Sequence, residues 1–393
     1  MAKYRFGDIC EVLNGRAYKQ NELLSRGKYP ILRVGNFFSS DRWYYSDMEL
    51  PENKYCDYED LLFAWSASFG PKIWDGGKVI YHYHIWKLIP NDEVADKFYL
   101  YYWLRHSVNR LTAGTHGSVM AHMTKGDMEN QSIELPSLQT QKKISSILRT
   151  IDEKIHNNEA INNNLEQQAK ALFKSWFIDF EPFGGVQPPE MKFVPLQELC
   201  KVVTKGTTPT TLGKPFTSSG INFIKAESIL DSHSIDSSKF AFIDEETNAL
   251  LKRSVIKAND IVFTIAGTLG RFAMVDNSVL PANTNQAVAI IRPDENKVTP
   301  AYLYSFFIGN WHNEYYSKRI QQAVQANLSL TTIKSLPIAV LSKTTMNNYD
   351  ELVSPLFALM KGNEEENRRL SELRDTLLPK LMSGELDVSN IEL

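Results

Sequence analysis

Cysteine is scarce in this sequence, and long apolar runs are missing from it. The 393 residues include three cysteines, Cys10, Cys56 and Cys200, whose wide spacing builds neither a disulfide framework nor a metal site. No apolar run approaches the ~18–20 residues of a transmembrane helix, and the first residues have no signal-peptide core. We therefore expect a cytoplasmic protein that holds no metal and does not bind a membrane.

The sequence also has little net charge. The formal charge is −3 at pH 7, and residues 341–393, with 6 basic and 10 acidic side chains, contain most of the acidity. A nearly neutral chain is not attracted to nucleic acid as a whole, so a DNA-binding surface must be a local patch. The length allows two or more domains with cores of their own.

A long heptad pattern runs from Gln139 to Trp176. Its seam positions follow one another at alternating steps of four and three residues: Ile144, Leu148, Ile151, Ile155, Asn158, Asn162, Leu165, Ala169, Leu172 and Trp176. A period of 3.5 is typical of a coiled-coil seam. Because neither proline nor glycine interrupts the run, it predicts one helix, roughly 55–60 Å long at about 1.5 Å per residue.

The same seam recurs 205 residues later, at Tyr349, Val353, Leu356, Met360, Asn363, Asn367, Leu370, Arg374, Leu377 and Leu381. We expect the two helices to pack antiparallel, with Asn158 and Asn162 meeting Asn363 and Asn367, because paired buried asparagines fix helix register. Solvated asparagines are the alternative. Pro355 falls inside the second pattern, either as the first helical residue after a Ser354 cap or as a kink.

The segment before each helix repeats as well. The strongest pair is 60–70 with 260–270, in which an aspartate opens a buried strand and a small polar loop ends on glycine. A glycine loop (14–16 and 205–209) and a basic strand end (Arg33 and Lys225) precede this pair. A second strand (81–90 and 286–293) and an aromatic helix (98–104 and 302–307) follow it, and this helix has core-facing spacing.

This order predicts an α+β protein with a pseudo-twofold internal repeat, in which two mixed α/β domains are separated by two long antiparallel coiled-coil helices. We place the first domain at 1–138, the first long helix and linker start at 139–183, the second domain at 184–340, and the second helix and tail at 341–393.

The layout resembles the specificity subunit of Type I restriction–modification systems. The resemblance rests on the opening of each half, the Asp60 and Asp260 strands, the run Glu-Leu-Pro-Ser-Leu-Gln-Thr-Gln at 134–141, and Leu-x-x-Leu-Arg-Asp-x-Leu-Leu-Pro-Lys-Leu-Met-Ser-Gly-Glu-Leu at 370–386. One departure is 340–346, which differs from 135–141, so we expect the entry into the second helix to be built differently.

The resemblance implies a non-catalytic subunit whose two target recognition domains each read one half of a bipartite DNA sequence, with the helix pair setting the spacing. Its implied partners are double-stranded DNA, two copies of a DNA adenine methyltransferase subunit and, in a complete complex, motor-nuclease restriction subunits. It implies no cofactor in this chain, because S-adenosylmethionine, ATP and Mg²⁺ belong to the partners.

Basic, hydroxyl and amide side chains in matching loops are the candidates for DNA contact, because these groups bind phosphates and base edges. In the first half they are Arg16, Lys19, Arg33, Ser66, Ser68, Lys72, His116, Ser118, His122 and Lys125. In the second they are Lys205, Thr207, Thr208, Lys225, Thr268, Arg271, Asn283, Asn285, Gln286, Gln325 and Asn327.

Short patterns with catalytic letters lack the context that catalysis needs. The Asp and Glu-x-Lys of 293–297 are contiguous instead of lying on separate strands, and His82 and His84 have no third ligand at suitable spacing. The run 179–185 faintly resembles a methyl-donor loop but follows a helix, and 76–78 lacks phosphate-loop spacing. One alternative stays open: a non-catalytic coiled-coil scaffold that binds proteins through its globular ends. The nearly neutral charge favours it, and the matching basic loops oppose it.

Overall fold

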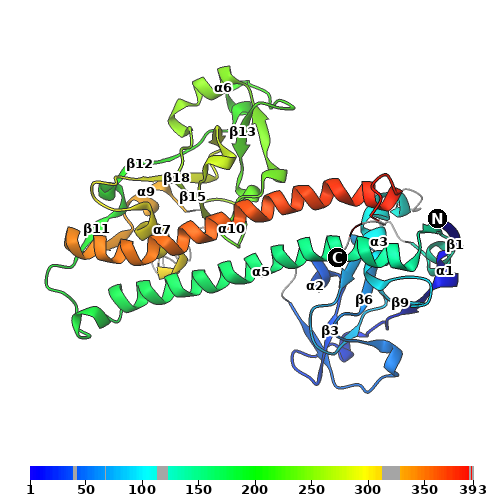
Figure 1. Ribbon diagram of the computed structural model, residues 1–393. Coiled ribbons are helices and arrows are strands. Elements are labelled where there is room, and N and C mark those ends of the chain that lie inside the picture. Colours follow the sequence, from blue (N-terminus) through cyan, green and yellow to red (C-terminus); the bar gives the residue numbers. More distant parts are fainter. Residues whose placement is uncertain (39–41, 67, 113–122, 312–327, 389–390, 392–393) are drawn as a thin grey trace. The chain divides into compact units, whose positions relative to one another are not determined.

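The computed structural model describes residues 1–38, 42–66, 68–112, 123–311, 328–388 and 391. It divides into two compact units, residues 1–157 with 365–393, and residues 158–364. Each unit contains one sheet-rich domain and part of both long helices, which confirms the predicted α+β class (Figure 1). None of the described helices has the length and apolar character needed to cross a membrane.

The two heptad patterns form two long helices, α5 (Leu138–Phe177) and α10 (Lys343–Ser383). All seam positions predicted from the sequence are buried or half-buried. The Ser354 cap is wrong, because α10 begins at Lys343 and Pro355 lies inside it. Ser342 precedes the helix instead, and its hydroxyl accepts a hydrogen bond from Thr345 N at 3.3 Å.

The helices run antiparallel within each unit. In the first unit Asp152 of α5 binds Arg374 of α10 at 2.8 Å, and Lys154 binds Glu366 at 3.1 Å. In the second unit Asn363 Nδ2 donates to Asn162 Oδ1 at 2.7 Å. Asn162 Nδ2 in turn donates to the carbonyl of Met360 at 3.1 Å. These hydrogen bonds, both donated by asparagine side chains, hold the two helices at one defined register.

The asparagine pair supports a prediction about helix register. Asn162→Leu is expected to cost about 1–3 kcal/mol, because it leaves the Asn363 amide half-buried without its side-chain acceptor. Asn162→Leu with Asn363→Leu should recover that loss, since an apolar seam removes both polar groups. Thermal unfolding followed by circular dichroism measures both, with exposed Asn163→Leu as the control. A double variant less stable than either single variant would contradict the prediction.

The described residues of the first domain form two four-stranded sheets and a two-stranded sheet. One four-stranded sheet has the order β2–β9–β6–β7, with β2 (Cys10–Asn14), β9 (Ile85–Pro90), β6 (Leu61–Ser66) and β7 (Ser68–Ile73). The other four-stranded sheet has the order β4–β3–β8–β5, with β4 (Tyr44–Ser46), β3 (Tyr29–Leu32), β8 (Val79–Tyr81) and β5 (Tyr55–Cys56). The third pairs β1 (Ala2–Arg5) with β10 (Ser132–Leu135), and the helices are α1 (Phe6–Ile9), α2 (Val34–Phe38), α3 (Lys97–Thr112) and α4 (Lys125–Glu129).

The second domain repeats this plan. Its four-stranded sheet has the matching order β12–β18–β15–β16, with β12 (Cys200–Lys205), β18 (Val288–Pro293), β15 (Ile261–Thr264) and β16 (Phe272–Met274). The next has the order β14–β13–β17, with β14 (Ala241–Ile243), β13 (Ile221–Ile224) and β17 (Ala282–Thr284). The last pairs β11 (Lys192–Pro195) with β19 (Pro337–Val340), and the α-helices among the described residues are α6 (Glu245–Leu250), α7 (Pro300–Ile308) and α9 (Leu330–Lys334).

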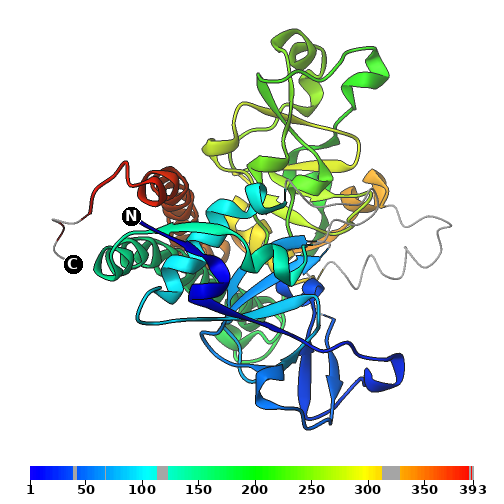
Figure 2. The same ribbon diagram turned by 90° about the vertical axis from the view of Figure 1, so that its right-hand side faces the viewer.

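The aromatic helices face the domain cores, as their spacing predicts. In α3 the buried residues include Tyr99, Leu100, Tyr102, Trp103 and Leu104, and in α7 they run without a break from Tyr302 to Ile308. In the first unit α5 and α10 contribute Ile144, Leu148 and Leu381 to the same core as α3. Figure 2 looks along the helices and shows the strands of the first domain on one side of α5.

The predicted second strands are too long at their N-terminal ends. Residues 82–84 form a turn between β8 and β9, so the strand predicted over 81–90 begins only at Ile85. In the second domain Gln286 lies in the matching turn, and β18 begins at Val288.

The two helix entries differ, as the sequence departure predicts. In the first, the buried Gln141 side chain donates to the carbonyls of Val94 and Pro136 at 2.9 and 3.0 Å and accepts from Asp96 N at 2.9 Å. The second has the apolar Met346 at the matching position. There, the Thr299 hydroxyl that caps α7 bonds to Asp350 at 2.5 Å and connects the domain to α10.

Candidate nucleic-acid interface

The glycine loop of each domain lies directly against backbone atoms of another segment. A Cβ atom on Gly15 would lie 2.3 Å from the carbonyl oxygen of His82, and a Cβ on Gly206 would lie 1.8 Å from that of Thr284. Real Cβ atoms do not approach backbone that closely, so only glycine fits at either position. The two loops are therefore held against the turns 82–84 and 285–287 by the same packing.

An aspartate at the start of a central strand anchors the sheet beneath each loop. Asp60 binds Lys87 of β9 at 2.6 Å, and Asp260 binds Arg292 of β18 through two bonds of 2.7 and 2.6 Å. Each carboxylate also accepts a backbone N–H three residues earlier, at 2.8 Å. Asp260 is fully buried, so its charge is compensated entirely within the protein.

A basic side chain that sequence reasoning missed approaches each glycine loop. Lys54 Nζ donates to the carbonyl of Asn14 at 2.8 Å, and Arg253 Nη2 donates to the carbonyl of Lys205 at 3.4 Å. Both acceptors directly precede the loop glycine. The signal in the sequence was a basic residue six or seven positions before Asp60 and Asp260, which becomes visible only once the two halves are aligned.

In the first domain several predicted cations are already bound to carboxylates. Arg16 binds Glu22 through bonds of 2.7 and 3.1 Å, Lys72 lies 3.5 Å from Asp75, and Lys125 lies 3.4 Å from Glu129. Lys19, Arg33 and Ser68 are exposed, and the Arg33 guanidinium lies 5.2 Å from the centre of the Tyr44 ring. Lys19 and Arg33 form no ion pair among the described residues, which leaves their charges available to a phosphate.

In the second domain the predicted residues gather around the Gly206 loop. Thr208 bonds to the Gln286 side chain, Thr207 accepts from Arg253 at 3.3 Å, and Asn285 accepts from Ala287 N at 3.1 Å. Lys205 is exposed, and within the described part of the chain it forms no ion pair. The loop 205–208, Arg253 and the turn residues 285–286 therefore bring together a lysine, a guanidinium, two hydroxyls and two amides.

Other predicted residues of this domain have structural partners. Arg271 is held by Asp231 at 2.7 and 2.5 Å and by the carbonyl of Ile229 at 3.4 Å. Lys225 lies 3.5 Å from Glu227 and 5.3 Å from the centre of the Phe216 ring. Thr268 is exposed on the loop between β15 and β16.

Two predicted contacts are not presented to solvent. Ser66 is buried at the end of β6. Asn283 is fully buried, where its amide donates to Asn248 and Leu251 at 2.8 and 3.3 Å and accepts from Thr284 N at 2.8 Å. Buried side chains cannot contact a duplex, so we leave both out of the DNA-facing set. His116, Ser118, His122, Gln325 and Asn327 lie outside the described residues.

The turn 82–84 carries an aromatic cluster. The Tyr83 ring centre lies 4.5 Å from that of His82 and 3.9 Å from that of His84, and Trp65 Nε1 donates to the Tyr83 carbonyl at 2.8 Å. Burial, together with the nearby charges of His84 and Arg33, lowers the pKa of His82 to about 4. At neutral pH His82 is therefore an uncharged imidazole with one donor and one acceptor.

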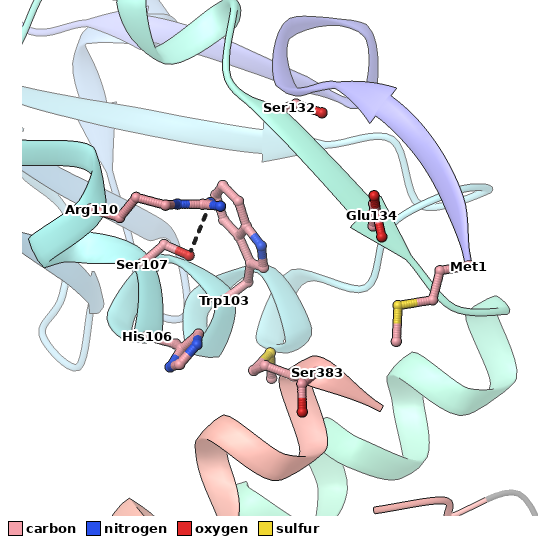
Figure 3. Close-up of a pocket in the computed structure, with 9 residues that line it drawn as sticks. Met1, Trp103, His106, Ser107, Arg110, Ser132, Glu134 and Ser383 are labelled. Carbon is pink, nitrogen blue, oxygen red and sulfur yellow. Dashed lines mark hydrogen bonds between the residues drawn. The ribbon is translucent and has the colours of Figure 1, made fainter. Parts of the chain in front are cut away.

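A cavity of about 460 Å³ opens in the first unit, away from the glycine loop. Figure 3 shows Met1, Trp103, His106, Arg110, Glu134 and Ser383 around it, which lie just before β1, on α3, on β10 and at the end of α10. Arg110 donates to Ser107 at 3.5 Å and lies 5.6 Å from the Trp103 ring centre. These residues line the junction of the domain with the helices, so the cavity does not extend the candidate interface.

The chain contains two copies of one sheet-rich domain, and each copy has a glycine loop, a three-residue turn and a nearby cation. This arrangement is typical of a protein with two recognition domains in tandem. Among the residues that the structure describes, no group of three or more His, Cys, Asp or Glu side chains could hold a metal ion. The two sites share a backbone plan but differ in side chains, as expected of domains that bind different ligands of one kind.

The chain belongs to the family of the Type I restriction modification DNA specificity domain, which it matches over residues 1–167 and 188–345. It is thus a non-catalytic specificity subunit with two DNA sequence-recognition domains, as the resemblance implied. A relative from Methanocaldococcus jannaschii, the Type I restriction enzyme MjaIX specificity subunit, is 26% identical over 321 residues, covering 77% of this chain and 72% of that protein.

Further similarities cover almost the whole chain. The EcoBI specificity subunit of Escherichia coli is 21% identical over 403 residues, covering 96% of this chain and 84% of that protein. The crystal structure of a Type-I restriction-modification system S subunit from M. genitalium has the same fold, with a TM-score of 0.61 and 16% identity over 97% of this chain and 95% of that one.

Proposed function

We propose that each domain reads one half of a bipartite DNA target, that the paired helices fix the distance between the halves, and that the chain binds two DNA adenine methyltransferase subunits. One observation carries the proposal: the same glycine loop, turn and cation recur in both domains with different side chains. Two domains that share a backbone plan but differ in the side chains of the loop and the turn suit a DNA target whose two halves differ in sequence.

The exposed groups around the glycine loops supply the contacts that DNA requires. Cations and hydroxyls beside a loop bind phosphates and set the orientation, and amides or aromatic groups reach base edges. We assign Lys19, Arg33 and Lys54 to phosphates in the first domain, and Lys205, Thr207 and Arg253 in the second. A local patch of this kind resolves the conflict between DNA binding and a net charge of −3.

The helices supply the spacing and the docking surface. A continuous helix is a stiff spacer, and hydrogen bonds such as that between Asn162 and Asn363 fix its register against the second helix. Leu352 and Leu359 on α10 are 47% and 52% exposed, seven residues apart on one face outside the seam. That apolar surface can receive a partner, and a chain with an internal repeat suits two identical subunits.

The methylated adenines of cells that express this chain with a methyltransferase subunit test the proposal. We expect a new split motif, in which two short specific sequences flank a fixed unspecific gap, and none in cells without the chain. Exchanging residues 1–138 for the matching domain of another specificity subunit should change one half of the motif only. A stable complex with an active methyltransferase that adds no motif would favour the protein-binding scaffold instead. Motor-nuclease subunits, if present, would add cleavage without changing the motif.

Lys205 gives a test of phosphate contact. Lys205→Ala is expected to weaken binding to a duplex that carries the mapped motif and to lower the salt slope of log Kd by about 1, because one phosphate contact releases about one counterion. Fluorescence anisotropy at several salt concentrations measures the slope. Lys201 on the same strand is the control, since it is exposed but lies 4.0 Å from Asp294. An unchanged slope for Lys205→Ala would remove this residue from the phosphate contacts.

A further inference from the structure

The turns 82–84 and 285–287 correspond residue by residue. Leu32 of β3 pairs with Tyr81, and the matching Ile224 of β13 pairs with Thr284. After each turn the chain enters β9 or β18, where Ile85 pairs with Ala64 and Val288 pairs with Thr264. Three residues separate these fixed points in both domains, so His82, Tyr83 and His84 correspond to Asn285, Gln286 and Ala287.

Backbone hydrogen bonds hold the two turns in one conformation. Each turn closes on itself, from Ile85 N to the His82 carbonyl at 2.9 Å and from Val288 N to the Asn285 carbonyl at 3.3 Å. The backbone carbonyl of the third turn residue accepts a hydrogen bond from a neighbouring segment. The His84 carbonyl accepts from Trp65 N at 3.1 Å, and the Ala287 carbonyl accepts from Ile265 N at 2.8 Å. The glycine loop packs against the first residue of the turn or the residue before it. The two turns therefore share these backbone bonds, whereas their side chains differ.

The central residue of each turn is the one that reaches solvent. Tyr83 is 38% exposed and Gln286 is also exposed, whereas the turn residues on either side of them are half-buried. The basic group of Lys54 or Arg253 is bonded to the loop beside the turn, so a duplex whose phosphates meet these cations would face the turn with its base edges.

We propose that these two turns are the base-reading elements of the two domains, with Tyr83 and Gln286 as their specificity-determining residues. The inference rests on the proposed function of the domains. Gln286, oriented by the bond between its side-chain oxygen and Thr208, presents an amide, the group that pairs with the N6 and N7 edge of adenine. Tyr83, whose ring packs at a tilt against two imidazoles, presents an apolar ring that suits the methyl group of thymine.

The test uses the full chain in complex with its methyltransferase subunit and a library of randomised DNA duplexes, from which methylated sequences are recovered. Gln286→Met should lower discrimination at an adenine position of one half-motif about tenfold or more and leave the other half unchanged. Tyr83→Ala should do the same at a thymine position of the other half. Gln286→Glu should shift the preference from adenine toward cytosine, because a carboxylate only accepts hydrogen bonds.

Matched controls separate reading from folding. Gln187→Met and Tyr58→Ala alter exposed residues of the same types away from the turns, and both should leave the motif unchanged. Thermal unfolding shows whether each variant folds, and Gln286→Glu keeps the test valid if Gln286→Met does not. Unchanged motifs in folded turn variants, beside a clear split motif for the wild-type chain, would overturn the assignment of the turns alone. No split motif for the wild-type chain would overturn the proposed function and this inference together.

Discussion

Replacing Asp260 with alanine is expected to destabilise the second domain by about 3–5 kcal/mol, the usual cost of removing one partner of a buried ion pair. Asp260 is fully buried, and Arg292 donates to both of its carboxylate oxygens. The variant leaves the guanidinium 20% exposed and without its carboxylate, and it also removes the acceptor for Lys257 N. The loss of stability is expected in β15 and β18, the two strands that support the turn 285–287.

Hydrogen exchange of the β15 and β18 amides in the full chain measures this loss of stability locally. A local measurement is needed because a protein with two compact units does not have to unfold in a single two-state transition. Asp260→Ala combined with Arg292→Met should recover part of the stability, because the unpaired charge is gone. Asp60→Ala is the matched comparison and should cost less, since Asp60 and Lys87 are 26% and 18% exposed and water can solvate them. Equal losses at the two sites would contradict the role of burial.

Replacing Gly206 with alanine is expected to abolish recognition of one half-site while the other half is still read. The new methyl group would lie 1.8 Å from the Thr284 carbonyl oxygen and 2.3 Å from its carbon, both rigid backbone atoms. The loop and the turn must therefore move apart, at a cost of about 1–3 kcal/mol for overpacking. Thr208 and Gln286 are then no longer positioned together, and Lys205 moves with the loop.

Motif mapping of methylated DNA measures this effect, and Gly15→Ala provides the mirror experiment in the first domain. There the methyl group would lie 2.3 Å from the His82 carbonyl oxygen, so the opposite half of the motif should be lost. Gly77→Ala is the control, because nothing lies within 4 Å of a Cβ at that position. Loss of both half-motifs from either loop variant would show that the domains do not read DNA independently.

Some of the interface followed directly from aligning the two halves of the sequence. The pairing of the Gly15 and Gly206 loops follows from the repeat, and the structure adds that Asn285 and Gln286 lie beside the second of these loops. The burial of Asn283 did not follow, because a polar residue next to a strand has the same pattern whether it faces solvent or a satisfied pocket. The ion pairs of Arg16 and Arg271 also depend on carboxylates elsewhere in the chain.

The sequence by itself determined the two long helices, the duplicated domains and the family, because heptad spacing and repeated motifs are local properties of the chain. Only the tertiary structure decided that Lys54 and Arg253 approach the glycine loops, and that 82–84 and 285–287 are the same turn. Lys54 and Arg253 bind backbone carbonyls that lie 40 and 48 residues away in the sequence, at Asn14 and Lys205. Carbonyls are the same in every residue, so no side-chain pattern records which of them meet.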